Sequence, residues 1–330
     1  MTTPQQTAAH RTPQQPLGSG FGARSTAREV LDGIDLTGRL AVVTGGYSGL
    51  GLETTRALSG AGATVVVPAR RPDAAREAVG GVERVEVDAL DLADLDSVRA
   101  FAERFLASGR RIDIMINSAA VMACPETRVG PGREAQFATN HLGHFALVNR
   151  LWPALAPTAR VISVSSRGHH ASPIRWDDLD FTRGYDKWQA YGQAKTANVL
   201  FAVHLDALGR SAGVRSFALH PGGILTPLQR HVPKAEQIRN GWIDADGNQV
   251  ADWLKTPEQG AATQVWAATS PRLAGLGGVY CEDCDIAVRT TDEGGGVRDY
   301  AVDPEQAARL WHLSAELTGV DAFATPGSTK

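Results

Sequence analysis

The stretch Leu40-Ala-Val-Val-Thr-Gly-Gly-Tyr-Ser-Gly-Leu-Gly51 decides which fold this chain is expected to adopt. Its first four residues are apolar and suit a buried strand, and a helical pattern, residues 52–58, follows the glycines. The glycines permit a tight turn and a close approach of a pyrophosphate to the backbone, and the helix N-terminus attracts phosphate charge. The order of strand, glycine turn and helix therefore predicts a dinucleotide site. Its candidate residues are Gly45, Tyr47, Ser48, Gly49, Leu50 and Gly51.

Strand and helix patterns alternate along the rest of the chain. Strands are expected at residues 64–67, 84–87, 112–116, 161–164, 215–219 and 278–280, and helices at residues 97–106, 135–151, 188–208, 257–268 and 304–317. A short helix capped by Ser25 or Thr26 precedes them. This alternation predicts an α/β fold, a single-domain Rossmann-type doubly wound parallel sheet with helices on both faces. Ligands bind such sheets at the carboxyl ends of the strands.

The composition indicates a soluble globular protein, with 43% hydrophobic and 21% charged residues in a chain of 330. Residues 1–22 are rich in Pro, Gln, Gly and Ser and are expected to form a flexible arm. Residues 23–292 are expected to form the catalytic domain, in which an aperiodic, aromatic loop at about 226–256 covers the substrate. Residues 293–330 are expected to supply a terminal helix and tail.

Charge and cysteine content exclude several classes of partner. A net charge of −3 gives no support to binding of nucleic acid or of an anionic membrane. No apolar run approaches the ~18 residues of a membrane span, and the N-terminus lacks the apolar run of a secretion signal, so we expect a cytoplasmic protein. The pair Cys281 and Cys284 has no second pair, and the pair His141 and His144 has no third ligand, so no metal site is predicted.

The end of the second strand indicates which cofactor the chain prefers. NAD enzymes tend to place an acidic residue there to accept from the ribose 2′-hydroxyl, whereas this chain has Arg70 and Arg71. Two guanidinium groups suit a 2′-phosphate and offer no acceptor to a bare ribose. The cofactor is therefore predicted to be NADP(H) rather than NAD(H).

Other strand ends supply further candidates for the cofactor site. The carboxylate of Asp91 could accept from an adenine amino group, and small side chains after the 112–116 strand would let the cofactor lie against the backbone. The turn that begins His220-Pro-Gly-Gly offers main-chain donors and acceptors, and a threonine hydroxyl follows it, a suitable seat for a carboxamide and a phosphate. These candidates are Asp91, Leu92, Asn117, Ser118, Ala119, Pro221, Gly222, Ile224 and Thr226.

Tyr191 and Lys195 are candidates for proton transfer, because residues four apart lie on one face of a helix. Use of a phenol near neutrality requires its pKa to fall by about 3 units, and a neighbouring ammonium in a partly dry cleft can supply that stabilisation. Ser165 and Ser166 end the 161–164 strand, where a hydroxyl would face the same crevice as a hydrogen-bond donor; no G-x-S-x-G pattern marks a nucleophile. Asn140, in an apolar helix, is either a structural tie or a functional group.

These motifs together resemble the short-chain dehydrogenase/reductase family over roughly residues 36–290. The resemblance rests on Thr44-Gly-x-x-x-Gly-x-Gly51, the Asn140 helix, Ser166, Tyr191-x-x-x-Lys195 and Pro221-Gly222. Within the family, the long gap between Ser166 and Tyr191, the Thr139-Asn-His-Leu-Gly-His144 stretch and Gly278-Val-Tyr-Cys-Glu-Asp-Cys284 look most like the branch of retinol dehydrogenases and the WW-domain oxidoreductase.

The resemblance implies an oxidoreductase that passes hydride between nicotinamide and a carbonyl or alcohol, with Trp242 and Trp253 suggesting a hydrophobic substrate. It implies that Tyr191 is the general acid and base, that Lys195 lowers the tyrosine pKa and binds the nicotinamide ribose, that Ser166 holds the substrate carbonyl, and that Asn140 organises a relay water. Homodimers or homotetramers are common among relatives. Ala120 stands where relatives have glycine, which would crowd the cofactor. A second hypothesis is therefore an NADP(H)-binding redox sensor or scaffold with little catalysis.

Overall fold

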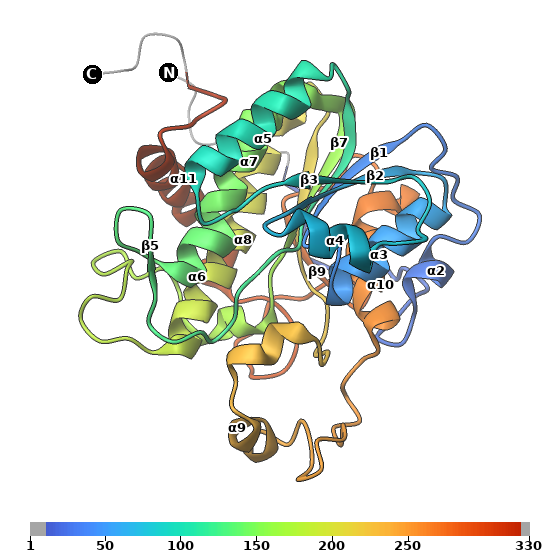
Figure 1. Cartoon of the computed structure of the whole chain (residues 1–330). Coiled ribbons are helices and arrows are strands. Elements are labelled where there is room, and N and C mark those ends of the chain that lie inside the picture. Colours follow the sequence, from blue (N-terminus) through green and yellow to red (C-terminus); the bar gives the residue numbers. More distant parts are fainter. Residues whose placement is uncertain (1–10, 325–330) are drawn as a thin grey trace.

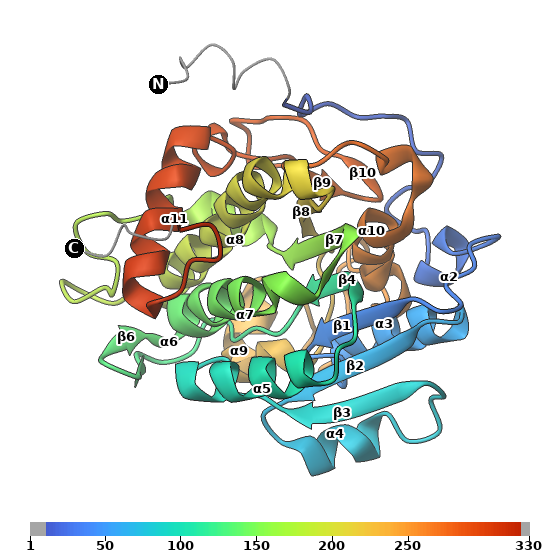
Figure 2. The same ribbon diagram turned by 90° about the horizontal axis from the view of Figure 1, so that it is seen from above.

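A computed structural model of the chain describes residues 11–324. An eight-stranded sheet forms its centre (Figure 1). Its strands lie in the order β10-β9-β8-β7-β4-β1-β2-β3 (Figure 2). Neighbouring strands are parallel except for β10, which pairs antiparallel with β9. The strands are β1 (Leu40–Thr44), β2 (Thr64–Ala69), β3 (Val85–Ala89), β4 (Ile112–Asn117), β7 (Leu155–Val164), β8 (Arg215–His220), β9 (Val279–Glu282) and β10 (Asp285–Ile286).

Helices cover both faces of the sheet (Figure 2). On one face lie α2 (Ala27–Val30), α3 (Gly49–Gly60) and α10 (Pro257–Thr269), and on the other lie α5 (Leu95–Ala107), α7 (Gly143–Leu151), α8 (Lys187–Gly209) and α11 (Pro304–Thr318). Alternate residues of β1 serve the two cores: Ala41 and Val43 face the first, Leu40 and Val42 the second. Neither face of this strand meets water, which explains its continuous apolar run from Leu40 to Val43.

The predicted α/β sheet and its main elements are confirmed, with ends that differ by a few residues. The helix expected at 135–151 is interrupted: α6 (Ala135–Phe137) and α7 are joined by a π-helical turn, Ala138–Leu142. Several short elements were not predicted, because they carry too few residues to show a periodic pattern. They are α4 (Pro72–Ala78), α9 (Lys234–Arg239), the hairpin of β5 (Arg128–Val129) and β6 (Arg133–Glu134), and β10.

The flexible arm expected at residues 1–22 needs correction over residues 11–22; residues 1–10 lie outside the described part. The side-chain amide of Gln14 donates to the main-chain oxygens of Tyr280 and Ala287, both at 2.7 Å, and accepts from the Tyr280 N–H at 3.0 Å. The Asp285 carboxylate accepts from the N–H groups of Leu17 and Ser19. Polar contacts to β9 and β10 thus hold this segment in place, although its apolar content is low.

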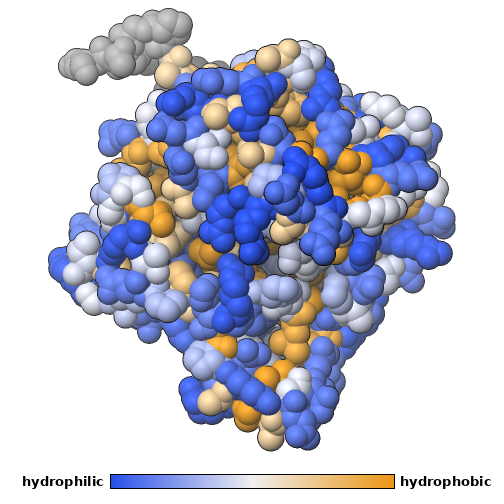
Figure 3. Space-filling model, viewed as in Figure 1, coloured by the Kyte–Doolittle hydropathy of each residue, from blue (hydrophilic) through white to orange (hydrophobic). Residues whose placement is uncertain are grey.

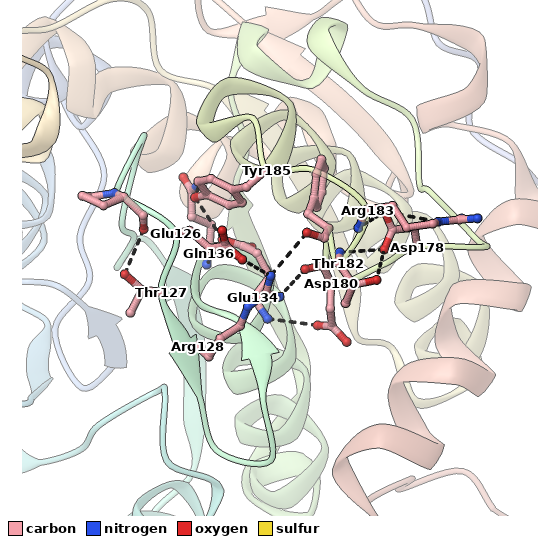
Figure 4. A network of polar contacts seen from close by, with 12 residues as sticks. Glu126, Thr127, Arg128, Glu134, Gln136, Asp178, Asp180, Thr182, Arg183 and Tyr185 are labelled. Carbon is pink, nitrogen blue, oxygen red and sulfur yellow. Dashed lines mark hydrogen bonds and ion pairs between the residues drawn. The ribbon is translucent and has the colours of Figure 1, made fainter.

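A polar network holds the long stretch between Ser166 and Tyr191 (Figure 4). Asp180 pairs with Arg133 at 2.7 Å and accepts from the Glu134 N–H at 2.9 Å, which attaches the stretch to the β5–β6 hairpin. The buried Glu134 carboxylate caps α6, and its burial raises its pKa. Gln136 donates to the Tyr185 hydroxyl at 3.0 Å. The network therefore fixes the chain that leads into the first turn of α8.

No helix among residues 11–324 is both long enough and apolar enough to cross a membrane.

The last helix, α11, packs on α8, where Trp311 stacks on Phe201 with ring centroids 5.8 Å apart. That face of α8 is thus covered by the chain itself.

Candidate functional site

A cavity of about 780 Å³ opens at the carboxyl ends of the sheet strands. It brings together residues that are far apart in the sequence, from Ala23 to Gly295. From the cofactor candidates its lining includes Gly45, Tyr47, Ser48, Gly49, Leu50, Gly51, Arg70, Arg71, Asp91, Leu92, Ser118, Ala119, Pro221, Gly222, Ile224 and Thr226. From the catalytic candidates it includes Ser166, Tyr191 and Lys195. The candidate site is thus one continuous space.

The glycine turn has the form that a dinucleotide requires. Gly45 and Gly49 have φ values of +68° and +51°, which side chains rarely tolerate. A Cβ on Gly51 would lie 2.2 Å from the main-chain oxygen of Gly45, so α3 can approach the turn only with glycine there. The Ser48 side chain makes no capping bond to α3, so the first N–H groups of this helix are left for a ligand. The turn therefore fits a pyrophosphate.

Two exposed arginines stand at the end of β2. Arg70 and Arg71 line the cavity, and within residues 11–324 neither forms an ion pair with a side chain of the protein. At the end of β3 the Asp91 carboxylate accepts from the Ala93 N–H at 3.0 Å, and Asp91 also lines the cavity. This end of the cavity combines free cationic charge with one carboxylate.

A buried histidine joins the glycine turn to its neighbours. His144 Nδ1 lies 2.9 Å from the Asn140 main-chain oxygen, which can only accept, so the proton sits on Nδ1. Its Nε2, 2.9 Å from the Thr44 hydroxyl, must then accept. The Thr44 oxygen accepts in turn from the N–H groups of Ser118 and Ala119. Burial lowers the pKa of His144 to about 4, which keeps the ring neutral.

Two asparagines among the candidates lie away from the cavity. Asn117 is buried between β1 and β7, where its amide contacts the Ser163 hydroxyl at 3.5 Å; it is therefore not a lining residue, contrary to expectation. Asn140 is fully buried, and its side-chain amide uses both polar atoms on Val121, accepting from N–H and donating to C=O, each at 2.9 Å. These bonds are those of a structural tie; the relay-water role of Asn140 stays a prediction.

The tyrosine, the serine and the lysine occupy the centre of the cavity. The Gly168 N–H donates to the Ser166 hydroxyl oxygen at 2.9 Å, and the serine hydroxyl forms a hydrogen bond with the phenol oxygen of Tyr191. Lys195 lies with its ammonium nitrogen 5.5 Å from the centre of the Tyr191 ring and donates to the Val164 oxygen at 2.9 Å. Ser165 instead donates to the Lys195 main-chain oxygen at 2.8 Å, so Ser166 is the serine that faces Tyr191.

The pKa of Tyr191 differs from the expectation. Burial raises it to about 12, while the bond from Ser166 opposes that rise. Burial also lowers the pKa of Lys195, to about 7. The expected depression of the phenol pKa by the ammonium is therefore not present in this structure, because the same dry surroundings favour the neutral form of both groups.

Gly168 was missed by the sequence analysis. A Cβ at this position would lie 2.8 Å from a carbon of the Tyr191 ring and 3.3 Å from the Ser166 hydroxyl oxygen. The glycine thus lets the tyrosine ring approach the serine. Its requirement arises from a tertiary contact, so no local pattern in the sequence could reveal it.

A charged group behind the Pro-Gly-Gly turn was also missed. The buried ammonium of Lys255 pairs with Asp283 at 2.6 Å, and its stem lies on Gly222, where a Cβ would meet it at 2.6 Å. The Lys255 N–H donates to the Gly223 oxygen at 2.8 Å. Nearby, burial raises the pKa of Glu282 to about 7. Lys255 thus supports the Pro-Gly-Gly turn through its main-chain bond to Gly223 and the packing of its stem on Gly222.

The loop expected to cover the substrate does border the cavity, through Trp242 and Trp253. It contains two short helices that were not predicted, the 3₁₀ turn Pro227–His231 and α9. Apolar side chains gather on the projection that carries α9 (Figure 3), including the exposed Ile238, Val250 and Trp253. Arg24 donates to the main-chain oxygens of Asp252 and Leu254, which ties the loop to the N-terminal segment.

The cysteines and histidines form no metal cluster among residues 11–324. Cys281 and Cys284 are buried free thiols, and burial raises the pKa of both. Such thiols are poor ligands and poor nucleophiles.

Comparisons with known proteins agree with this geometry. The family model described as short chain dehydrogenase matches residues 39–237. A "Probable oxidoreductase" of Streptomyces lividans is 46% identical over 297 residues, covering 86% of this chain and 98% of the relative. Retinol dehydrogenase 11 of Mus musculus is 35% identical, covering 87% and 88%. A crystal structure of an uncharacterised protein from Mycobacterium paratuberculosis, 33% identical, superposes with a TM-score of 0.67 and covers 88% and 97%.

The family model spans more than half of the chain, and the relatives align over most of their own lengths. Members of this family bind a nicotinamide cofactor and act on small molecules, which suits the cavity beside the glycine turn. The chain therefore belongs to the short-chain dehydrogenase/reductase family of oxidoreductases, close to its retinol dehydrogenase-like branch.

Proposed function

We propose that the protein is an NADP(H)-dependent oxidoreductase that transfers hydride between nicotinamide and a ketone or aldehyde, or the corresponding alcohol. One observation carries this proposal: Tyr191, Ser166 and Lys195 line the same cavity as the glycine turn. The cavity thus contains a proton donor, Tyr191, a hydrogen-bond donor, Ser166, and a cation, Lys195, next to the glycine turn that would bind a dinucleotide. That combination serves carbonyl reduction and alcohol oxidation.

The preference for NADP(H) rests on Arg70 and Arg71. Both line the cavity and are exposed, so their guanidinium groups are available to a 2′-phosphate. Arginine forks bind phosphate oxygens in pairs, whereas a ribose 2′-hydroxyl would require an acceptor. The glycine turn, the N-terminus of α3 and these arginines would hold the cofactor, which supplies the hydride when bound.

The protein residues manage the proton on the substrate oxygen. Ser166 accepts from the Gly168 N–H, and its own O–H, which bonds the Tyr191 phenol in this structure, would turn to the carbonyl oxygen of a bound substrate. In reduction, Tyr191 gives its proton to that oxygen as the carbonyl carbon gains hydride, so no uncompensated alkoxide forms. In oxidation the same phenol oxygen takes the proton back. When Lys195 is protonated, its ammonium beside the ring would favour the phenolate that remains after donation and so oppose the rise in the Tyr191 pKa that burial causes.

The wall of the cavity favours an apolar substrate. Met122, Trp188, Leu228 and Trp242 all line it, and all four pack in one cluster with Tyr191. A hydrophobic ketone, aldehyde or alcohol would bury apolar surface there and exclude water from the reacting groups.

The proposal is tested by following NADPH and NADH consumption over a panel of apolar ketones and aldehydes. We expect turnover with NADPH, and a loss of at least ~100-fold in kcat for Tyr191→Phe with NADPH binding retained. Tyr185→Phe is the matched control, since it also removes a phenol hydroxyl but one that contacts the Cys124 oxygen in the Figure 4 network. Turnover retained in Tyr191→Phe would reject the role of Tyr191; tight NADPH binding with no carbonyl reduced would reject the enzymatic function.

A further inference from the structure

His169 lies three residues after Ser166, in the 3₁₀ turn Arg167–Ala171, and its ring is completely buried. Its Nδ1 is 2.7 Å from the Ser166 main-chain oxygen, and its Nε2 is 3.2 Å from the Arg298 nitrogen. The ring therefore bridges the serine wall of the cavity to a segment that is far away in the sequence.

These two partners determine where the ring proton sits. The Ser166 carbonyl oxygen can only accept, so Nδ1 carries the hydrogen. The Arg298 N–H can only donate, so Nε2 offers its lone pair. Only the neutral Nδ1–H tautomer makes both bonds. Burial lowers the pKa of His169 to about 3, which agrees with a neutral ring.

Other groups hold the main chain of His169. The Tyr300 hydroxyl donates to its carbonyl oxygen at 2.7 Å. The Thr196 hydroxyl of α8 lies 3.2 Å from the same oxygen and makes its shorter bond, at 2.7 Å, to the Ser172 oxygen. The His169 N–H donates to the Ser166 oxygen at 3.0 Å. The ring packs against Tyr280, with centroids 5.1 Å apart. The turn after the serine is thus fastened to α8, to β9 and to the 296–300 segment.

We propose that His169 is a positioning residue for Ser166: the Nδ1–H of the neutral ring holds the serine carbonyl and so fixes where the serine hydroxyl points, while the bond from the Arg298 N–H orients the ring. This inference rests on the proposed function, since it assigns the hydroxyl of Ser166 to the substrate oxygen. The 3₁₀ turn is short and has only one bond to the Ser166 side chain, from Gly168. Loss of the anchor would let the turn shift and move the hydroxyl away from Tyr191.

The competing role for a buried histidine is to fill the core. Three substitutions separate the two roles. Asparagine places an amide nitrogen near the Nδ1 position and keeps the bond to Ser166. Glutamine places its amide near the Nε2 position and keeps the bond to Arg298. Phenylalanine keeps the volume of the ring and neither hydrogen bond. Positioning of Ser166 therefore predicts that His169→Asn retains more activity than His169→Gln or His169→Phe.

The full-length variants are assayed with NADPH and a carbonyl compound that the wild type reduces. We expect kcat within about 3-fold of wild type for His169→Asn and at least ~10-fold lower for His169→Gln and His169→Phe, the value of one lost hydrogen bond. The affinity for NADPH, measured by fluorescence, should stay unchanged, because His169 does not line the cavity. The matched control is His141→Asn, since that buried histidine bonds Ser314 of α11 instead.

Core filling predicts the opposite ranking. If kcat of His169→Phe equals or exceeds that of His169→Asn, the positioning role is rejected. It is also rejected if kcat falls in proportion to the loss of Tm in every His169 variant and in the His141→Asn control alike. Should His169→Phe fail to fold, the comparison of asparagine with glutamine still decides between the two roles.

A measurement without turnover keeps this inference separate from the proposed function. Long-range ¹H–¹⁵N spectra of the wild type should show His169 as the Nδ1–H tautomer from pH 5 to 8. The ring should stay neutral over this range, because burial and the neighbouring His170 and Arg298 all lower its pKa. An Nε2–H tautomer would overturn the bridge. If the wild type reduces no carbonyl, the proposed function fails, yet the spectra still show whether the bridge exists.

Discussion

The main-chain oxygen of Gly45 lies 2.2 Å from the point where a Cβ on Gly51 would begin. Real Cβ atoms essentially never come so close to an oxygen, so α3 would have to move away from the turn to accept any side chain there. The turn and the start of α3 are the two groups that a pyrophosphate would contact. The close approach of α3 to the turn is therefore possible only because Gly51 has no Cβ.

The substitution Gly51→Ala should abolish NADPH binding and lower Tm. The matched control is Gly60→Ala, at the other end of α3, where an added Cβ meets nothing within 4 Å. That change should be neutral or should stabilise the protein by about 0.5–1 kcal/mol, because alanine loses less chain entropy in a helix. Fluorescence titration and thermal melts measure both effects. Equal cofactor affinity in the two variants would contradict the assigned turn.

The pair Arg70 and Arg71 should discriminate between NADPH and NADH. Replacing both by alanine should weaken NADPH binding by about 10- to 100-fold, the value of one or two charge-assisted hydrogen bonds, and leave NADH binding nearly unchanged. Arg76→Ala is the control, since this arginine of α4 is exposed and pairs with Asp73. The assignment is wrong if the double variant loses affinity for both cofactors equally.

Removal of Asp283 should cost more stability than removal of Lys255. The lysine side chain is 5% exposed and the aspartate side chain 54% exposed, so Asp283→Asn leaves a buried ammonium unpaired, whereas Lys255→Met leaves only a solvated carboxylate. Methionine also keeps apolar volume on Gly222. We expect a loss of about 2 kcal/mol for Asp283→Asn and under about 1 kcal/mol for Lys255→Met in urea unfolding. The reverse order would show that the pair does not depend on burial of the ammonium.

Buried neutral histidines should make the protein sensitive to acid. Burial lowers the pKa of His141 to about 3, from 6.5 in the unfolded chain. Between these values the unfolded state binds the additional proton, so this histidine's contribution is present above pH 6.5 and is lost as the pH falls, by up to about 1.4 kcal/mol per pH unit. His144 and His169 shift the same way, whereas burial raises the pKa of Glu134 and acts oppositely.

The variant His141→Gln isolates one of these groups, because the others are shared with the wild type. At pH 7 the variant should be less stable, since glutamine keeps an amide near Nε2 for Ser314 but loses the packing of the ring against Phe137 and Phe145. The difference from wild type should then shrink as the pH falls toward 4, measured by urea unfolding at several pH values. A difference that is independent of pH would show that His141 titrates alike in the folded and unfolded chains.

Periodicity and spacing predicted much of this molecule. The apolar runs at 40–43 and 64–67 are almost entirely buried as β1 and β2, which explains why their continuous apolar pattern indicated central strands of a parallel sheet. Tyr191 and Lys195 are one helical turn apart, a relationship set within a single element. The arm at residues 11–22 was misjudged because its order comes from Gln14 and from Asp285, which is 268 positions away from Leu17.

The sequence by itself determined the sheet, the glycine turn and the family, because those features depend on local spacing and on burial of apolar runs. Only the tertiary structure decided which serine faces the tyrosine, that Asn117 and Asn140 lie outside the cavity, and that burial drives the phenol and the ammonium toward their neutral forms. It also placed Gly168 against the Tyr191 ring, His169 within hydrogen-bond distance of the Ser166 carbonyl and Lys255 against Gly222. Those properties depend on partners that are distant along the chain and on the local dielectric, and both exist only after folding.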